Sequence, residues 1–319
     1  MSILITGGLG YIGSHISKIY NDSELVIIDN LSNSSLNYKK VLPHANVIIK
    51  DLNIENLNFI FKNYDIDSVI HLAGLKSVSD SVKNPLNYYR KNVSTTLDLL
   101  ETMEKFKVNK LIFSSSATVY GNNQTSPLSE EIKTSAVNPY GETKIINENL
   151  IKNYCNSNKN FSSVILRYFN PIGAYKSGEL SDNPEGKPQN LMPLIIESAK
   201  TRKILNVFGS DYDTKDGTCI RDYIHIVDLA ESHLKSLQYL KKLTGYEIFN
   251  VGLGTGISVL ELINLFEKTN KIKINYKFSN RRIGDASISF ASNHKIKKIL
   301  KWSPLYSYAD MCRDSWNAS

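Results

Sequence analysis

The chain has 319 residues and a net charge of +7, with 41% hydrophobic and 22% charged residues. These values are typical of a soluble globular protein with enough length for one large domain or two ordinary ones. No apolar run reaches membrane-spanning length, which excludes a transmembrane protein. The positive charge comes from dispersed lysines without a nucleic-acid motif, so it suits a phosphorylated small molecule equally well, and the alternative is that it only keeps the protein soluble.

The cysteines and the N-terminus indicate a compartment. Cys155, Cys219 and Cys312 are widely spaced and form no CxxC pair, which argues against a disulfide framework or a zinc site. No metal is therefore predicted. The N-terminus enters a short apolar strand without the basic region and long apolar core of a signal peptide. We expect a protein of the reducing cytoplasm.

The chain opens with the pattern of a dinucleotide-binding fold. Residues 3–6 predict a buried strand, and a glycine-rich turn and a helix to Tyr20 follow at once. Gly7 permits the tight turn, Gly10 lets the backbone approach a pyrophosphate, and Gly13 lets the helix pack close to the strand. The spacing is GxxGxxG rather than GxGxxG. The helix N-terminus offers free N–H groups to phosphate.

The second strand, residues 25–28, ends at Asp29. An acid about 20 residues after the glycine turn is placed to accept hydrogen bonds from an adenosine ribose. Its charge would repel a 2′-phosphate, and this favours NAD over NADP. The alternative is an acid that only ends a strand.

Alternating strands and helices continue along the first half. They are predicted over residues 47–49, 53–63, 68–72, 85–107 and 110–113. This order predicts a doubly wound parallel sheet, whose ligands bind at the carboxyl ends of the strands. Asp29, Asp51, Gly74 and Ser116 all follow such ends, so we expect them along one edge.

The stretch 138–144, NPYGETK, carries the candidate catalytic pair. Pro139 suits the start of a helix, which we predict to run to about Tyr154. Tyr140 and Lys144 are four residues apart and therefore share one helix face. A nearby ammonium lowers the pKa of a phenol, so the pair can supply a base. Ser116 is a candidate partner of Tyr140, whereas a solvated helix face is the alternative for the pair.

Several longer motifs resemble a known family. TGGLGYIG, Asp29, SSSATVYG and YGETK resemble the extended short-chain dehydrogenase/reductase superfamily. HLAGLKSVSDSV, RYFNPIGA, NLMP, GTCIRDYIHIVDLA and RRIGD are similar to the UDP-glucose 4-epimerase family. The resemblance covers essentially the whole chain in the right order. It implies a Rossmann domain over residues 1–169 and a smaller C-terminal α/β substrate domain over 170–319, with some later segments returning to the first.

The resemblance also implies tightly held NAD, a homodimer and a reaction. Tyr140 as phenolate takes the proton from the sugar 4-hydroxyl, and C4 passes hydride to the nicotinamide. The 4-keto sugar then swings about its pyrophosphate and receives the hydride on its other face. Ser116 steadies the oxygen, while Lys144 holds the nicotinamide ribose and tunes Tyr140.

The family pattern assigns binding residues by position. Those implied for the cofactor are Gly7, Gly10, Tyr11, Ile12, Gly13, Asp29, Asn30, Asn33, Ser34, Asp51, Leu52, Leu72, Ala73, Gly74, Lys76, Asn92, Ser114, Tyr140, Lys144 and Phe169. Those implied for the UDP-sugar are Lys76, Ser116, Thr118, Tyr140, Asn170, Asn190, Leu191, Asn206, Phe208, Arg221, Tyr223, Arg282, Asp285 and Ser289. Taken separately, each arginine would more often be a surface charge and Phe208 an ordinary core residue.

The second half continues the predicted pattern. It contains strands over 161–167 and 205–208 and a helix that Asn190 and Leu191 open and that ends near Lys200. Residues 250–256, NVGLGTG, mimic a second dinucleotide loop but are interpreted as a strand-to-helix turn. Trp302 and Trp316 are expected to pack in the core.

Two alternatives remain open from the residues. Sugar-nucleotide dehydratases and decarboxylases place acids in the stretch after Ser116, where this chain has Ala117 and Thr118. Elimination would lack its acid, which favours simple oxidation and re-reduction. A non-catalytic NAD-binding regulator would usually lose the tyrosine or the lysine, and both are present.

Ser289 departs from one branch of the family. Epimerases restricted to UDP-glucose and UDP-galactose carry a large tyrosine at this position, and those that accept N-acetylated sugars carry a small residue. A serine leaves room for an acetamido group. We therefore hypothesise that the enzyme also interconverts UDP-GlcNAc and UDP-GalNAc, unless neighbouring residues fill the gap.

Overall fold

The largest sheet has seven strands in the order β11-β6-β5-β4-β1-β2-β3. The computed structural model describes residues 2–20, 24–34, 42–122, 126–176, 178–182, 188, 190–282 and 285–319. The strands of this sheet are β1 (Ser2–Thr6), β2 (Glu24–Asp29), β3 (Ala45–Ile49), β4 (Ile66–His71), β5 (Lys110–Ser116), β6 (Ser162–Tyr168) and β11 (Gly245–Val251). β1 pairs in parallel with β2 and β4, β2 with β3, and β4 with β5.

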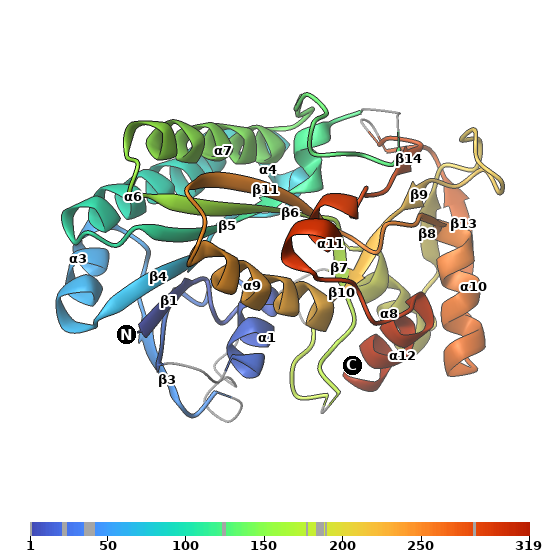
Figure 1. The fold of residues 1–319 in the computed structure, drawn as a ribbon. Helices are drawn as coiled ribbons and strands as arrows, with labels where there is room; N and C mark the ends of the chain where they lie inside the picture. The colour runs from blue at the N-terminus through green and yellow to red at the C-terminus, as the bar shows by residue number, and fades with distance from the viewer. Residues whose placement is uncertain are drawn as a thin grey trace. The chain divides into compact units, whose positions relative to one another are not determined.

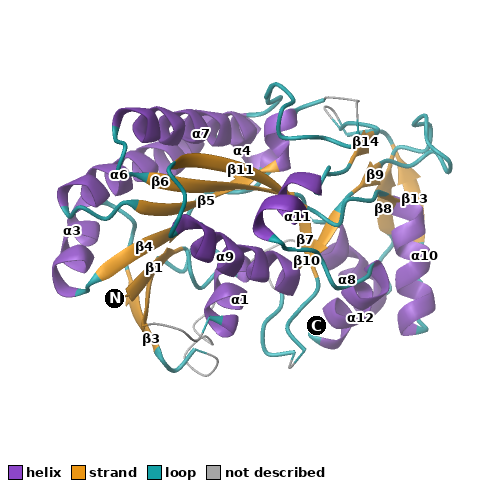
Figure 2. Cartoon of the chain, viewed as in Figure 1, coloured by secondary structure: helices purple, strands orange, loops and turns teal. Residues whose placement is uncertain are grey.

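Helices cover both faces of this sheet (Figures 1 and 2). They are α1 (Tyr11–Ile19), α3 (Ile54–Asn63), α4 (Val78–Lys83), α5 (Pro85–Tyr88), α6 (Thr95–Lys105), α7 (Pro139–Ser157) and α9 (Ile226–Leu240). One core cluster joins apolar side chains of α3, α6 and α7 to strand residues such as Leu4, Val69 and Leu111. In Figure 1, α1 and α9 lie on the opposite face. The predicted doubly wound α/β fold is therefore confirmed.

The prediction of one continuous helix over 85–107 is wrong, because three consecutive segments occupy this range. After α5 the chain forms a π-helical segment, Tyr89–Ser94, and only then α6, which ends at Lys105. The short α4 before them was not predicted. Hydrophobic periodicity does not distinguish a widened π turn from an ordinary turn, and such turns occur frequently at functional sites.

A second set of elements follows Tyr168. Its small sheets are β10-β7, β12-β9-β14 and β13-β8. The strands are β7 (Asn170–Ile172), β8 (Leu205–Phe208), β9 (Ile220–Arg221), β10 (Tyr223–His225), β12 (Ile257–Ser258), β13 (Tyr276–Ser279) and β14 (Ile288–Ser289). The helices are α8 (Leu191–Thr201), α10 (Val259–Asn270), α11 (His294–Leu300) and α12 (Tyr308–Asn317). Apolar residues of α8, α10 and α12, among them Ile195, Phe266 and Met311, share one core.

The chain divides into two compact units. Unit 1 comprises Met1–Val119, Thr134–Arg167 and Ala230–Phe249, and unit 2 comprises Tyr120–Lys133, Tyr168–Leu229 and Asn250–Ser319. The assignment of NAD to residues 1–169 and of the sugar nucleotide to 170–319 stays a prediction. Over the described ranges, no helix combines the length and apolarity needed to cross a bilayer.

Candidate functional site

The glycine turn between β1 and α1 has the geometry of a phosphate cradle. Gly7 has a φ of +69°, and a Cβ there would lie 2.9 Å from Ala73. A Cβ on Gly13 would lie 2.5 Å from the Cα of Gly8, so the helix start and the turn are in close contact. A Cβ on Gly10 would meet only the Gly7 carbonyl oxygen, at 3.4 Å. Open space thus remains at the N-terminus of α1, where a pyrophosphate fits.

Asp29 stands at the end of β2 as predicted. Its carboxylate accepts hydrogen bonds from the Leu9 N–H at 3.0 Å, the Leu31 N–H at 2.8 Å and the Ser34 hydroxyl at 2.9 Å. A carboxylate has about four acceptor positions, so room for a ribose hydroxyl remains. The Asp29 carboxylate thus connects the loop after β1, through Leu9, to the loop after β2, through Leu31 and Ser34. The position of Asp29 fits an NAD ribose.

Three further predicted cofactor residues lie at the ends of neighbouring strands. The amide of Asn30 donates to Asp51 at 2.8 Å, and Lys91 of the π-helical segment lies 3.6 Å from the same carboxylate. The Asn30 hydrogen bond and the Lys91 charge lower the pKa of Asp51. Leu52 follows, and its side chain packs against the core of unit 1. Of the remaining predicted residues, Tyr11 and Ile12 open α1, and Asn33 lies just before Ser34 in the loop after β2.

Hydrogen bonds connect the side chains of Thr6, His71 and Thr96 near the carboxyl ends of β1 and β4. His71 Nδ1 lies 2.7 Å from the Thr6 hydroxyl, and Nε2 lies 3.0 Å from the Thr96 hydroxyl. Because Thr96 donates to the Asn92 carbonyl, it accepts from Nε2–H, and His71 is the neutral Nε2–H tautomer. Burial, with Lys144 nearby, lowers the pKa of His71 to about 3. His71 was not among the predicted site residues, although it stands at a strand end and opens the motif HLAGLKSVSDSV.

Asn92 connects the loop after β4 to α7. Its side-chain oxygen Oδ1 accepts from the Leu75 N–H at 2.8 Å. Its side-chain NH₂ group donates to the Leu75 carbonyl and to the Thr143 hydroxyl, each at 3.0 Å. Both amide hydrogens therefore bind protein atoms. Direct cofactor binding by Asn92 stays a prediction; the contacts seen connect Leu75, in the loop after β4, to Thr143 of α7. Lys76, in the same loop, is exposed.

α7 places the candidate catalytic pair at its first turns. The Asn138 side chain caps the helix by accepting from the Gly141 N–H at 2.9 Å, and Pro139 is the first helical residue. Lys144 Nζ lies 5.8 Å from the centre of the Tyr140 ring, and it donates to the Ser114 carbonyl at 2.7 Å. A hydrogen bond from the Ser116 side chain lowers the pKa of Tyr140, and contact of Ser116 with a substrate oxygen stays a prediction.

The pKa values of this pair differ from the expectation. Burial raises the pKa of Tyr140, and only the Ser116 hydrogen bond opposes that shift. The ammonium of Lys144 is directed at the Ser114 carbonyl and is not among the causes of this shift, so the predicted lowering of the Tyr140 pKa by Lys144 stays a prediction. Burial lowers the pKa of Lys144 to about 8, partly offset by Glu148.

A buried ion pair lies one helical turn beyond Lys144. Arg167 binds the Glu148 carboxylate through Nε at 2.9 Å and Nη2 at 2.7 Å, and Ser115 donates to it at 2.6 Å. Both charged side chains are almost fully buried. This pair was not predicted, because no local sequence pattern marks two charges 19 residues apart as partners.

The turn after β5 fits closely against α7. Thr118 donates its N–H to the Ser116 hydroxyl at 3.3 Å, and a Cβ on Gly141 would lie 3.0 Å from the Thr118 carbonyl. The Thr118 hydroxyl is buried and has no partner in the described residues. The turn therefore fixes Ser116 beside Tyr140.

In unit 2 the structure places five of the residues predicted for the UDP-sugar in contact or in register with one another. Arg221 lies 3.4 Å from Asp285, and Arg282 stacks 4.1 Å from the Phe208 ring. Ser289 is the register partner of Arg221 between β14 and β9. The positions 283 and 284 of the RRIGD motif lie outside the described residues.

Other predicted residues of unit 2 occupy element ends. Asn190 is the exposed N-cap of α8, and Leu191 packs against the core of the unit. Tyr223 and Phe169 are buried. Asn206 is exposed on β8 and accepts from Ser279 at 3.3 Å.

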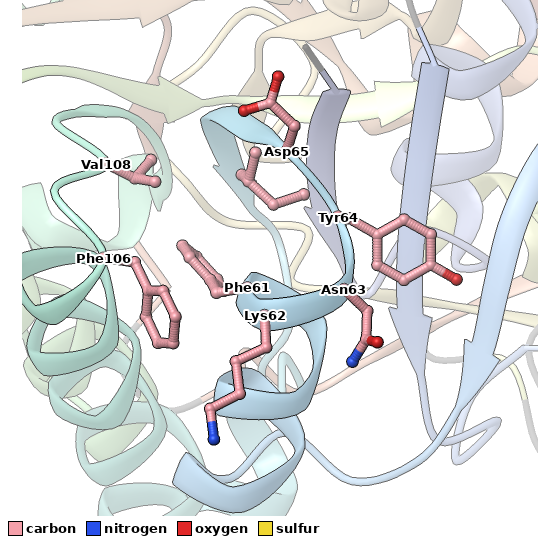
Figure 3. A pocket seen from close by; sticks show the side chains of 8 residues that line it. Phe61, Lys62, Asn63, Tyr64, Asp65, Phe106 and Val108 are labelled. Atoms are coloured by element: carbon pink, nitrogen blue, oxygen red, sulfur yellow. The ribbon is translucent and has the colours of Figure 1, made fainter.

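A cavity of about 330 Å³ lies away from these residues (Figure 3). It is lined by Phe61, Lys62, Asn63, Tyr64, Asp65, Ile66, Phe106 and Val108. Ile66 begins β4, so the cavity is at the amino ends of the strands, opposite the edge where α/β sheets bind ligands. It is therefore not the candidate site.

Comparisons with known proteins agree with this geometry. The model of the NAD dependent epimerase/dehydratase family matches residues 3–252. A UDP-glucose 4-epimerase of Bacillus subtilis is 45% identical over 325 residues, covering 99% of this chain and 96% of the relative.

Solved structures show the same fold over the full length. UDP-glucose 4-epimerase from Bifidobacterium longum in complex with NAD+ and UDP has a TM-score of 0.95 and 38% identity, covering 100% of this chain and 98% of that chain. The UDP-Glc/GlcNAc 4-epimerase from Campylobacter jejuni has a TM-score of 0.87 and 36% identity, covering 99% and 98%. The chain therefore belongs to the NAD dependent epimerase/dehydratase family.

Proposed function

We propose that this protein is an NAD-dependent UDP-glucose 4-epimerase that interconverts UDP-glucose and UDP-galactose. The observation that carries the proposal is the group formed by Ser116, Tyr140 and Lys144, held at the carboxyl end of β5. The relatives at 45% identity over nearly the whole chain, named UDP-glucose 4-epimerase, support the same activity.

The residues of the chain supply proton transfer and positioning. When bound, NAD supplies the acceptor and the donor of hydride. Tyr140 in its phenolate form takes a proton from the sugar 4-hydroxyl and then returns it, while the Ser116 hydroxyl holds the same oxygen. General acid–base catalysis of this kind typically contributes about 10²–10⁴-fold. Lys144 places a positive charge beside the phenol, and its bond to the Ser114 carbonyl fixes that charge.

No acid serves an elimination in the turn after Ser116. Ala117 and Thr118 occupy it, and the Thr118 hydroxyl is buried. Oxidation followed by re-reduction at the same carbon needs no further acid. This supports an epimerase over a dehydratase.

The substrate range is proposed to include UDP-GlcNAc and UDP-GalNAc. Ser289 lies in register with Arg221, so the two side chains project from the same face of their small sheet. A serine beside a diphosphate-binding arginine leaves space where a tyrosine would stand. The similarity to the Campylobacter jejuni protein, named a UDP-Glc/GlcNAc 4-epimerase, supports this range.

One experiment tests both parts. Purified protein without added cofactor is given UDP-galactose and UDP-GalNAc in parallel, and the products are followed by NMR. We expect conversion of both to their 4-epimers. Conversion of UDP-galactose alone would remove the wider range, and no conversion of either after NAD is added would remove the epimerase proposal.

We further propose a cytoplasmic homodimer. Apolar side chains of α4, α5 and α6 support a subunit contact, because Val82 is 62%, Leu86 81% and Leu97 40% exposed. Light scattering on the purified protein should give twice the mass of 36.0 kDa; a monomeric mass would contradict the dimer.

A further inference from the structure

Asp222 is a fully buried acid between two residues predicted to bind the UDP-sugar, Arg221 and Tyr223. It belongs to neither β9 nor β10 but joins them. Burial raises the pKa of Asp222 to about 7, although backbone N–H groups that bind it oppose that shift. A buried carboxylate without a catalytic role needs a structural reason.

At Asp222 the backbone changes its hydrogen-bonding partner from strand β14 to strand β7. Its N–H donates to the Ser289 carbonyl at 3.0 Å, which continues the parallel β9–β14 pairing. Its carbonyl accepts instead from the side-chain amide of Asn170 at 2.6 Å and from the Asn170 N–H at 3.3 Å, which belongs to the β10–β7 pairing. In a continued parallel ladder the Ala291 N–H would bind that carbonyl.

The Asp222 carboxylate binds the Ala291 N–H in place of the backbone carbonyl that would bind it in a continued ladder. One carboxylate oxygen accepts from the Ala291 N–H and from the Gly254 N–H, each at 3.0 Å. The other accepts from the Leu253 N–H at 2.9 Å. A Cβ on Gly252 would lie 2.5 Å from this carboxylate.

These contacts explain the second glycine-rich motif of the sequence. Consecutive backbone N–H groups in such a turn form an anion-binding concavity. In this chain the concavity of residues 252–254 holds the carboxylate of Asp222 rather than a phosphate. The motif therefore serves the chain itself, and no second dinucleotide is needed to account for it.

We propose that Asp222 is a positioning residue of the UDP-sugar site, which holds Asn170, Arg221 and Ser289 in their relative places. The proposal rests on the proposed function, because that function makes these three residues substrate contacts. Asp222 is buried and does not touch the substrate. Moving its carboxylate would leave the Ala291 N–H without its acceptor at the end of the β9–β14 pairing, which carries Arg221 and Ser289, and would shift the backbone whose carbonyl binds Asn170.

Asp228 provides a matched control in the same unit. It is also buried, and its carboxylate accepts two backbone N–H groups from a distant loop, Leu305 at 3.0 Å and Tyr306 at 3.1 Å. These partners are not among the residues predicted for the substrate. A loss of stability common to both aspartates can thus be separated from an effect on binding.

The experiment compares Asp222→Asn with Asp228→Asn. Asparagine keeps the size of the side chain but places an NH₂ group against N–H donors, so it removes at least one hydrogen bond. We expect Asp222→Asn to weaken UDP binding, measured by calorimetry, about tenfold or more. The KM for UDP-galactose should rise in parallel, while kcat and the amount of bound NAD change little. Asp228→Asn should lower the melting temperature but leave UDP affinity near that of the wild type.

Unchanged UDP affinity in Asp222→Asn, or equal weakening in Asp228→Asn, would overturn the proposal. If Asp222→Asn does not fold, Gly252→Ala displaces the same carboxylate with Asp222 intact and is measured in the same way. Hydrogen exchange on the wild type needs no variant: UDP should slow exchange at Leu253, Gly254 and Ala291, and unaltered exchange there would contradict the proposal. A wild-type protein that binds UDP without converting UDP-galactose would refute only the epimerase activity.

Discussion

The ammonium of Lys144 donates to the carbonyl of Ser114 at 2.7 Å, two residues before the catalytic candidate Ser116. The three serines that end β5 each meet one residue of α7. Ser116 binds Tyr140, Ser114 binds Lys144, and Ser115 binds Glu148. Because these α7 residues are four apart, one helix face aligns the proton donor, the cation and the buried acid along one strand end.

Replacement of Tyr140 by Phe should abolish turnover and retain NAD. The ring remains, so packing changes little, but the group that moves the proton is lost; we expect kcat to fall by about 10²–10⁴-fold. Bound NAD is measured by absorbance after the protein is denatured. Tyr154→Phe, which removes a hydroxyl from the same helix near Asn158, is the control and should keep full activity. Turnover by Tyr140→Phe near the wild-type rate would exclude the assigned role.

Lys144→Met should inactivate the enzyme without destabilising it at pH 7. Burial lowers the pKa of Lys144 from 10.5 to about 8, so the folded state bears a cost for the charge. Methionine fills similar space without it, and we expect the free energy of unfolding to rise by about 1 kcal/mol.

Lys144→Met should also change how the free energy of unfolding depends on pH. Between about pH 8 and 10.5 the unfolded chain binds more protons at Lys144 than the folded protein, so the wild type gains stability as pH rises. Lys144→Met lacks this gain. Urea unfolding at both ends of that window measures it, and parallel curves for the two proteins would contradict the burial argument.

Asp29→Asn should weaken NAD binding and reduce the preference for NAD over NADP. The substitution removes the charge that repels a 2′-phosphate, and its NH₂ group opposes the Leu9 and Leu31 N–H donors. We expect less NAD in the purified protein and a ratio of NAD to NADP affinity lower by about tenfold. Cofactor released from the protein is measured by chromatography. Asp67→Asn, which affects a half-buried pair with Lys110, should leave the NAD content unaltered.

Glu148→Gln should be the most destabilising of these changes. It removes the Glu148 carboxylate from the buried Arg167 charge, which costs about 3–5 kcal/mol. Lys152 lies 3.5 Å from the same carboxylate but is partly exposed, so Lys152→Met should cost less than about 1 kcal/mol. Equal losses in urea unfolding would show that Arg167 is not the main partner.

Lowering the pH should remove the stabilisation of the folded state that the ionised Glu148 provides. Burial raises the pKa of Glu148, but the Arg167 and Ser115 hydrogen bonds outweigh it, so that the pKa is lowered below 4.5. The stabilisation is therefore present above pH 4.5 and is lost as pH falls through the lower value in the folded state. Glu148→Gln should show a shallower loss of stability in acid than the wild type.

Ser289→Tyr should separate the two proposed substrates. A tyrosine beside Arg221 fills the space that an acetamido group would need, so turnover of UDP-GalNAc should be lost and that of UDP-galactose kept. Ser289→Ala keeps the space and should convert both. Conversion of UDP-GalNAc by Ser289→Tyr at the wild-type rate would refute the gating role.

Much of the first unit could be predicted because its signals are local. The run before Gly7, the acid after β2 and the pair Tyr140 and Lys144 each depend on a few consecutive residues. Parallel strands bring their carboxyl ends to one edge, so the approximate neighbourhood of Asp29, Asp51, Gly74 and Ser116 followed from the order of elements alone.

The contacts that hold the site could not be predicted in this way. The Thr6–His71–Thr96 chain, the Glu148–Arg167 pair and the carboxylate of Asp222 join residues far apart in sequence. The direction of the Lys144 ammonium depends on the carbonyl of Ser114, a backbone atom present at every position. Spacing therefore identified Tyr140 and Lys144 but not the raised pKa of the phenol.

The π-helical segment Tyr89–Ser94 fixes a rotational register. It carries Asn92, whose amide holds the loop after β4, and it leads into α6, whose residues Leu99 and Met103 lie in the core. A π turn contains one residue more than the corresponding α turn. Deleting one residue there would rotate Asn92 by about 100° relative to α6. The length of this segment, as much as its composition, therefore determines whether α6 can stay in the core while Asn92 reaches Leu75 and Thr143.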